Sequence, residues 1–228
     1  MNWQKDVKWK RFYEKRSNLL ILQVFQHNIN MKKTLVLLFS FISLTLFSQD
    51  INQIDKALNI PDSLSYDAEI RIYKGFGITN LTEVFRMYKK RNQWKIERYF
   101  YYAPVQEMQK PNIKKIKLTA KTHPEFVWQS ILRANILEIP DMEEIMYKLQ
   151  KRGEVQFVDE SYEVWNKTSF ITDGTGFKVK IKRGKDSNEI YYGNPESYLK
   201  MYPEVDELLF FSELLNVIKS EFNMWRYN

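Results

Sequence analysis

An uncharged apolar segment near the N-terminus decides which residues of this chain belong to its folded part. Residues 34–47 read TLVLLFSFISLTLF and follow the basic pair Lys32–Lys33. These fourteen residues are too few for a helix that crosses a bilayer core, which takes roughly 20 apolar residues. They fit the apolar region of a secretory signal peptide, which has about 7–15 residues. We therefore predict a signal peptide at 31–48, cleaved between Ser48 and Gln49.

Other interpretations of this segment remain open. Without cleavage, 34–47 anchors the protein to the inner membrane. A buried core helix is the third possibility, although such a helix normally has a polar face and the polar side chains here are only small hydroxyls. Residues 1–30 are either a long basic extension of the signal or sequence upstream of the true start, and the Met31-Lys-Lys beginning favours the second. In both cases 1–48 is excluded from the fold, which leaves a single domain at 49–228.

The basic character of the chain resides in the part that we predict to be removed. The net charge is +7, and residues 1–48 contribute +6 of it through eight basic and two acidic residues. Residues 49–228 are close to neutral and lack the positive field with which proteins approach nucleic-acid phosphates. We therefore predict no nucleic-acid partner. Two lysine rows are interpreted as the wet side of a sheet: Lys115 and Lys117, and Lys178, Lys180 and Lys182.

The absence of cysteine limits how the predicted domain can be stabilised. No disulfide can form, and no lipid can be attached to a cysteine at the mature N-terminus. A domain of roughly 180 residues is long enough to bury an adequate apolar core without such links. This composition suits a bacterial periplasmic protein better than a small disulfide-bonded extracellular module.

Hydrophobic periodicity predicts an α+β fold, in which an antiparallel sheet of a meander and hairpins packs against a C-terminal helix and two short central helices. Period-two alternation predicts strands at 66–76, 82–88, 94–102, 113–120, 155–158, 162–165, 169–172, 177–182 and 189–192. Helical spacing, proline and capping residues predict helices near 51–58, from 124, at 142–149, after 194 and at 204–222. A hairpin turn at Asp173-Gly174-Thr175-Gly176 is predicted to join 169–172 to 177–182.

The predicted domain offers few residues for catalysis. His123 is its single histidine and stands beside Pro124 at a predicted helix start, so we interpret it as a loop residue. One histidine and no cysteine leave no transition-metal site of ordinary composition. The glycine-rich stretch at 173–176 is not followed by the lysine of a phosphate-binding loop. We predict neither a metal nor a cofactor.

Carboxylate chemistry is the one catalytic alternative that the sequence leaves open. A glycosidase needs two carboxyl groups about 5–9 Å apart across a cleft, which closeness in sequence does not establish. Turn formation and interaction with helix dipoles explain both acidic clusters better. The clusters are Asp159, Glu160 and Glu163, and Asp141, Glu143 and Glu144.

Tyrosines at outward-facing strand positions favour binding instead. Exposed tyrosine suits the recognition of sugars, peptides or partner proteins. The interpretation that we favour for these rings, however, is that they fill the core of a domain without disulfides. The positions are Tyr73, Tyr99, Tyr101 and Tyr191.

The signal with glutamine just after its cleavage point resembles exported proteins of Bacteroidetes bacteria. Residues 171–222, in which a hairpin is followed by Asn-Pro-Glu and a terminal helix, are also similar to uncharacterised exported proteins of that group. Asp62-Ser63-Leu64 is similar to their short O-glycosylation acceptor. The helical C-terminus does not look like their β-rich sorting domain, which implies a periplasmic location.

We expect a non-catalytic binding or interaction protein with an envelope protein, peptide or glycan as partner and no membrane anchor after cleavage. The alternative is a carboxylate-dependent hydrolase acting on envelope glycans.

Overall fold

A computed structural model describes residues 51–75, 79–105, 109–168, 171 and 174–225. The chain divides into two units, Met1–Gln49 and Asp50–Asn228, and these residues belong to the second. The predicted signal at 31–48, with its processing residues Ser48 and Gln49, lies outside the described residues. Within the described part, no helix is both long and apolar enough to span a membrane.

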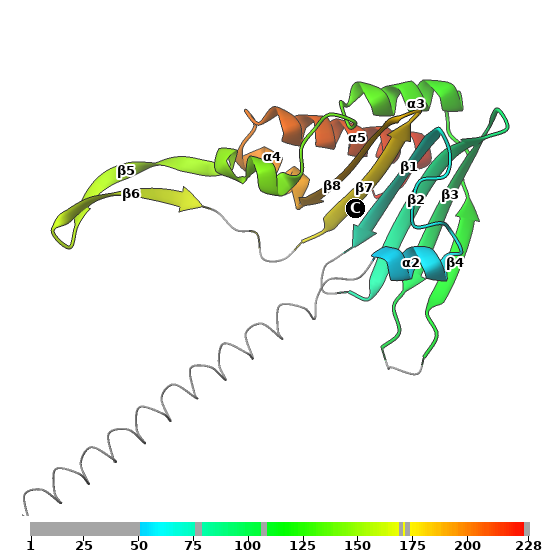
Figure 1. Ribbon diagram of the computed structural model, residues 1–228, viewed down its shortest axis with the longest axis horizontal. Coiled ribbons are helices and arrows are strands. Elements are labelled where there is room, and N and C mark those ends of the chain that lie inside the picture. Colours follow the sequence, from blue (N-terminus) through cyan, green and yellow to red (C-terminus); the bar gives the residue numbers. More distant parts are fainter. Residues whose placement is uncertain (1–50, 76–78, 106–108, 169–170, 172–173, 226–228) are drawn as a thin grey trace, which may run out of the picture. The chain divides into compact units, whose positions relative to one another are not determined.

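The main sheet has six antiparallel strands (Figure 1). They lie in the order β4-β3-β2-β1-β7-β8, which confirms the meander of the first four strands and places β7 beside β1. Their bounds are β1 (Ala68–Gly75), β2 (Leu81–Lys90), β3 (Gln93–Tyr102), β4 (Asn112–Lys117), β7 (Gly176–Arg183) and β8 (Asp186–Gly193). The predicted alternation is confirmed, because Ile70 and Ile72 point to one side of β1 and Arg71 and Tyr73 to the other.

Tight turns set the register of the consecutive strands. The β2–β3 link consists of Arg91 and Asn92, both at positive φ (49° and 60°), and it closes the pair Lys90–Gln93. Two residues in the left-handed region match the twist of a hairpin, and asparagine adopts this region at little cost. The β7–β8 link uses Gly184 at a φ of 62° for the same purpose.

Of the five helical segments in the described part of the chain, four pack on the apolar face of the sheet. The segments are α2 (Ile51–Ala57), α3 (Pro124–Arg133), the 3-10 helix η1 (Met142–Lys148), α4 (Pro195–Met201) and α5 (Asp206–Phe222). At the centre of the main core, the ring of Phe211 on α5 stacks on Tyr192 with centroids 4.3 Å apart and meets the edge of Phe177 at 6.1 Å. The protein therefore has the predicted α+β fold with a C-terminal helix against an antiparallel sheet.

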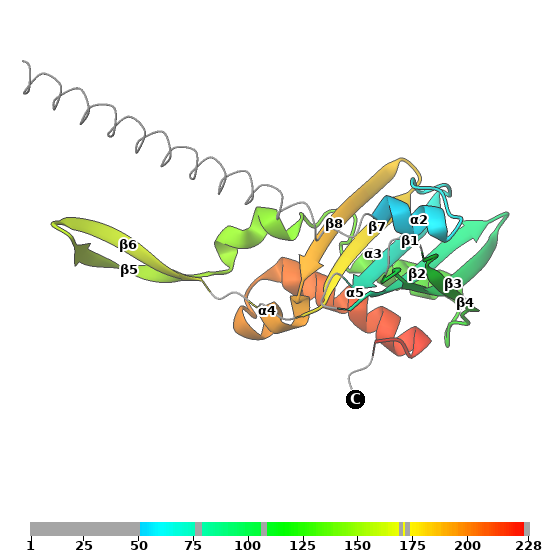
Figure 2. The ribbon, with the colours of Figure 1, turned by 90° about the horizontal axis from the view of Figure 1, so that it is seen from below.

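Helix α2 covers the opposite face of the sheet, as Figure 2 shows by its place across the sheet from α5. A second, smaller core lies beneath it. Its buried members come from α2, the loop that follows and strands β1 to β3: Ile54, Leu58, Ile60, Tyr73, Val84, Tyr99 and Tyr101. The central strands are thus buried on both faces.

The outer edge of β8 is closed by side chains rather than by another strand. The backbone N–H of Glu189 donates to Asn188 Oδ1 at 2.9 Å, and that of Tyr191 donates to Asp141 Oδ2 at 2.8 Å. The N–H of Gly193 lies 3.2 Å from Met142 Sδ. Since an edge strand with open N–H groups invites pairing with another chain, these contacts remove one site of unwanted association.

The predicted hairpin of 169–172 with 177–182 is wrong. Strand β7 pairs with β1 on one edge and with β8 on the other, so it has no free edge for a third strand. Most of the predicted first arm lies outside the described residues. Gly174 has another role, which is to leave room for the side chain of Asn194: a Cβ at position 174 would meet Asn194 Oδ1. This oxygen accepts a hydrogen bond from Thr175 N at 2.8 Å. This contact joins the start of β7 to the start of α4.

A separate two-stranded sheet is formed by β5 (Gln150–Val158) and β6 (Ser161–Thr168). Asp159 and Glu160 form its two-residue turn, at φ values of 47° and 67°. The sequence predicted strands at both places, and the structure joins them as one antiparallel hairpin.

Candidate functional site

Three cations lie side by side on the face of the sheet that α2 covers. Arg71 of β1 is directly opposite Arg86 of β2 on one side and Lys180 of β7 on the other. Like charges in directly opposite positions destabilise a sheet, so this row requires acids between its members. Glu69 of β1 and Asp55 of α2 supply them, and both carboxylates are fully buried.

The guanidinium of Arg71 has no exposed surface, and all three of its nitrogen atoms donate hydrogen bonds. Nε donates to Glu69 Oε1 at 2.9 Å and Nη1 to Asp55 Oδ2 at 3.1 Å. Nη1 also donates to the carbonyl of Pro61, and Nη2 donates to that of Ser63 at 3.1 Å. Burial by itself lowers the pKa of Arg71, but the Glu69 carboxylate and the hydrogen bonds raise it above its ordinary value. Arg71 therefore stays charged and fixes the loop after α2.

Glu69 neutralises two of the three cations at once. Its Oε1 accepts hydrogen bonds from Arg71 Nε and Arg86 Nε, both at 2.9 Å. Its Oε2 accepts the backbone N–H groups of Ser65 at 2.8 Å and Tyr66 at 3.2 Å. One buried carboxylate thus ties the loop after α2 to two strands of the sheet.

Asp55 completes the arrangement from the helix side. Its Oδ1 accepts the phenol hydrogen of Tyr73 at 2.6 Å, and its Oδ2 lies 3.7 Å from Lys180 Nζ as well as beside Arg71. Burial raises the pKa of Asp55, and the Tyr73 hydrogen bond and the charges of Arg71 and Lys180 offset part of this rise. Burial and the neighbouring Asp55 charge also raise the pKa of Tyr73, so its phenol remains protonated and keeps donating.

The polar contacts continue across the sheet to β3 and the edge strand β4. Glu97 of β3 accepts a hydrogen bond from Tyr99 at 2.6 Å and pairs with Lys115 of β4 at 2.8 Å. Burial raises the pKa of Glu97, but the hydrogen bonds from Lys115 and Tyr99 outweigh it, and the net pKa lies below the ordinary value. We call the set Asp55, Glu69, Arg71, Tyr73, Arg86, Glu97, Tyr99, Lys115 and Lys180 the charge network.

The centre of the charge network is closed to solvent. Asp55, Glu69, Arg71 and Tyr73 are fully buried, so a substrate has no access to them. Buried ion pairs of this kind contribute little net stability but cost several kcal/mol when one member is removed. The network therefore acts by holding α2 and the loop after it in one position on the sheet.

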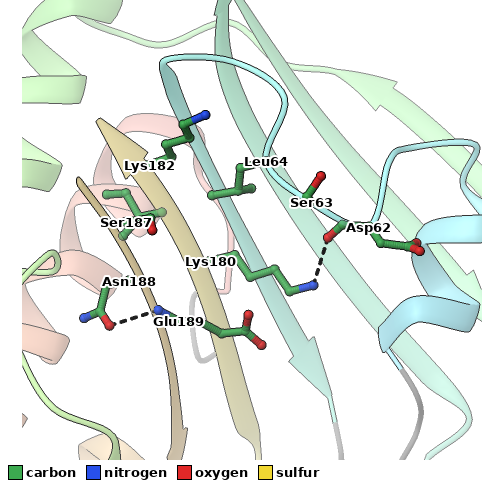
Figure 3. A pocket seen from close by; sticks show the side chains of 9 residues that line it. Asp62, Ser63, Leu64, Lys180, Lys182, Ser187, Asn188 and Glu189 are labelled. Carbon is green, nitrogen blue, oxygen red and sulfur yellow. Dashed lines mark hydrogen bonds between the residues drawn. The ribbon is translucent and has the colours of Figure 1, made fainter. Parts of the chain in front are cut away.

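A groove of about 410 Å³ opens beside the charge network (Figure 3). Asp62, Ser63 and Leu64 of the loop after α2 form one wall, and residues 180–182 of β7 and 187–189 of β8 form the other. The loop wall is fixed because the carbonyls of Pro61 and Ser63 accept from Arg71 and that of Asp62 accepts from Lys180 Nζ at 3.2 Å.

Several groove residues already have protein partners. Glu189 pairs with Lys178 at 2.9 Å, and the Asn188 amide donates to the carbonyls of Ile136 at 3.1 Å and Ile139 at 2.8 Å. Four side chains have no hydrogen bond or ion pair among the described residues: Asp62, Ser63, Lys182 and Ser187. The groove thus presents one available carboxylate, one available ammonium group and two hydroxyls.

Comparison with known proteins adds no homologue to this description. No protein-family model, no curated protein and no solved structure matches the chain. The geometry of the groove and of the charge network therefore has to support the functional argument by itself.

The residues singled out in the sequence lie mostly away from the groove. The interpretation that the tyrosines fill the core is confirmed for Tyr73, Tyr99 and Tyr101, which are 0%, 3% and 7% exposed beneath α2. The exposed surface that a binding role for these three rings would require is therefore not present. Tyr191 remains 36% exposed. The interpretation of Lys180 as a wet-face lysine is wrong, because α2 and the loop after it cover it.

Several residues of the two predicted acidic clusters have structural roles. Asp141 caps η1 and shares a reciprocal capping box with Glu144, while Asp159, Glu160 and Glu163 belong to the β5–β6 hairpin. His123 caps α3, where its Nδ1 accepts a hydrogen bond from Glu125 N at 3.3 Å. Among the described residues, no group of three or more histidine or acidic side chains is placed to hold a metal ion.

Sequence reasoning did not find the groove because its two walls are far apart in the chain. The signal that could have indicated it is the alternation on β1, where Glu69, Arg71 and Tyr73 share one face. Two charges on the same face of a central strand indicate a polar layer above the sheet, which in turn requires a covering segment.

Proposed function

We propose that this chain is an exported, non-catalytic binding protein of the periplasm, and that the groove beside the charge network holds its ligand. The observation that carries the proposal is a groove whose loop wall is held by buried charges and whose polar groups include four without a partner among the described residues. Its volume of about 410 Å³ falls in the range of roughly 300–1,000 Å³ that is usual for ligand sites. A wall that is fixed in advance loses little entropy when a ligand binds.

The available groups suggest the class of ligand. Lys182 and Asp62 lie toward different ends of the groove in Figure 3, with the Ser63 and Ser187 hydroxyls available for hydrogen bonds. A small ligand with a carboxylate at one end and an ammonium group at the other complements this arrangement. A short peptide has this chemistry, and so does an amino sugar that carries an acid.

A titration of the isotope-labelled protein with a zwitterionic dipeptide tests the proposal. We expect saturable shifts of the amide signals of 62–64, 180–182 and 187–189. The variant Lys182→Gln should weaken binding at least roughly tenfold, since a charge-assisted contact is worth about 1.5–3 kcal/mol. Lys185→Gln, in the β7–β8 turn outside the groove, is the matched control and should bind as the unchanged protein does.

Two other outcomes of that titration are informative. Saturable shifts of the same amides with an acidic amino sugar but not with the dipeptide would assign the site to a glycan. If neither compound shifts these signals, the groove is not the binding site and the proposal fails.

The alternative, a carboxylate-dependent hydrolase of glycans, would have to use Asp62 and Glu189, the two carboxyl groups that line the groove. Glu189 Oε1 lies 2.9 Å from Lys178 Nζ, so this carboxylate already has a partner within the protein. Asp62 is then the one groove carboxylate without a partner among the described residues, whereas a glycosidase needs two carboxyl groups facing the substrate. The pairing thus favours binding over hydrolysis.

The proposed export is tested by the intact mass of the protein purified from its native host. We expect a chain that begins at Gln49, one residue before the unit Asp50–Asn228. A chain that retains 34–47 and sediments with membranes would show an anchored protein instead.

A further inference from the structure

The β5–β6 hairpin exposes a continuous apolar face. Val155 is directly opposite Val164, and Phe157 is directly opposite Tyr162, so these four side chains share one side of the hairpin. They are 67%, 63%, 64% and 78% exposed in that order, and the rings of Phe157 and Tyr162 lie 5.0 Å apart. We call these four residues the hairpin patch. The other side presents Glu154, Gln156, Glu163 and Trp165.

An uncovered patch of this kind requires an explanation. A two-stranded hairpin by itself is marginally stable in water, and exposed apolar clusters on soluble proteins commonly mark interaction sites. We propose that the hairpin patch is a dimerisation surface, on which the hairpin of a second copy of this chain packs face to face and in the opposite direction.

The charges along the hairpin favour a second copy in that orientation. The tip carries Asp159 and Glu160, three and four residues after Gln156, which stands between Val155 and Phe157 in the sequence and faces the other side. The base carries Arg152 and Lys151, four and five residues before it. When two hairpins pack antiparallel about their patches, the acidic tip of each therefore lies against the basic base of the other.

The register of the hairpin also brings two like charges together at its base. Lys151 is directly opposite Lys167, and like charges in this position destabilise a hairpin. The tip carboxylates of a second copy would place negative charge beside this pair. An anionic membrane surface fits less well as an occupant, because the acidic tip would be repelled from it.

The area of the hairpin patch is adequate for a dimer at the small end of the usual range. The exposed fractions correspond to about 500 Å² per hairpin, given side-chain areas of roughly 150–250 Å² for aromatic residues. Two copies together bury about 1,000 Å², which is near the lower limit for a specific interface. We therefore expect a dimer with micromolar affinity that has one two-fold axis.

Sedimentation equilibrium of the purified protein at micromolar concentrations tests this inference. We expect a monomer–dimer equilibrium, and we expect Phe157→Ser combined with Val164→Thr to weaken dimerisation at least tenfold. Phe126→Ser is the matched control, because Phe126 is 62% exposed on α3, outside the hairpin. This control should dimerise as the unchanged protein does.

Charge exchange separates the proposed orientation from general apolar association. Asp159→Lys with Glu160→Lys should weaken dimerisation, and adding Lys151→Glu with Arg152→Glu should restore it. The inference is overturned if the unchanged protein is monomeric throughout, even if it then binds lipid vesicles or another protein. A dimer that the patch variants leave unaffected overturns it as well.

Discussion

Replacing Arg71 with methionine is expected to destabilise the protein by about 3–5 kcal/mol, the cost of leaving buried charges without their partner. Methionine has a similar length, so the change leaves no large cavity. It does leave Asp55 without its main cation and removes the donors to the carbonyls of Pro61 and Ser63. The loss is measured as the shift of the urea unfolding midpoint at constant slope.

Two further variants identify the cause of this loss. Lys114→Met changes an exposed lysine of β4 in the same way and should alter the free energy of unfolding by less than about 0.5 kcal/mol. Adding Asp55→Asn to Arg71→Met should recover part of the loss, because the carboxylate that Arg71 no longer pairs is replaced by a neutral amide. If Arg71→Met is as stable as the Lys114 control, the charge network does not hold α2 in place.

Replacing Phe211 with alanine is expected to destabilise the protein by a similar amount, about 3–5 kcal/mol, through loss of buried area and creation of a cavity. Phe211 is fully buried between Tyr192 and Phe177, at the contact of α5 with β7 and β8. Removing its ring deprives both neighbours of an aromatic contact. Equilibrium unfolding followed by circular dichroism measures the effect.

Leu209→Ala is the matched control on the same helix. Leu209 is 43% exposed, so its truncation removes less buried area and should cost less than half as much. Equal losses in the two variants would contradict the packing of α5 on the sheet through Phe211.

The sequence predicted the fold well wherever its pattern is local. On β1 the alternation of Ile70 and Ile72 with Arg71 and Tyr73 identified both faces of the strand. The proline before Glu196 and the apolar stripe that includes Phe211 identified α4 and α5. In each of these segments the periodicity reflects contact with one core, and that contact is the same along the whole segment.

The failures arose where a second layer covers the sheet. Alternation shows that Tyr73 faces away from the main core, but it cannot show whether water or α2 lies on that side. Helix α2 has only seven residues, too few for its own pattern to indicate what it packs against. The contact between Lys180 and the carbonyl of Asp62 spans 118 positions, a separation at which no local signal exists. The groove depends on that contact and was therefore missed.

The pairing of β1 with β7 has a consequence for the order in which the molecule assembles. Ile70 lies opposite Ile181, so the central strand obtains its second neighbour only after more than a hundred further residues have been made. Contacts between such distant segments slow folding, because a long chain must be ordered before they form. A chain that emerges with its N-terminus first can form the hairpins of β1 to β4 early. The contacts of Lys180 with Asp55 and with the carbonyl of Asp62 form only after β7 has been made. The loop wall of the groove is therefore among the last parts of the molecule to form.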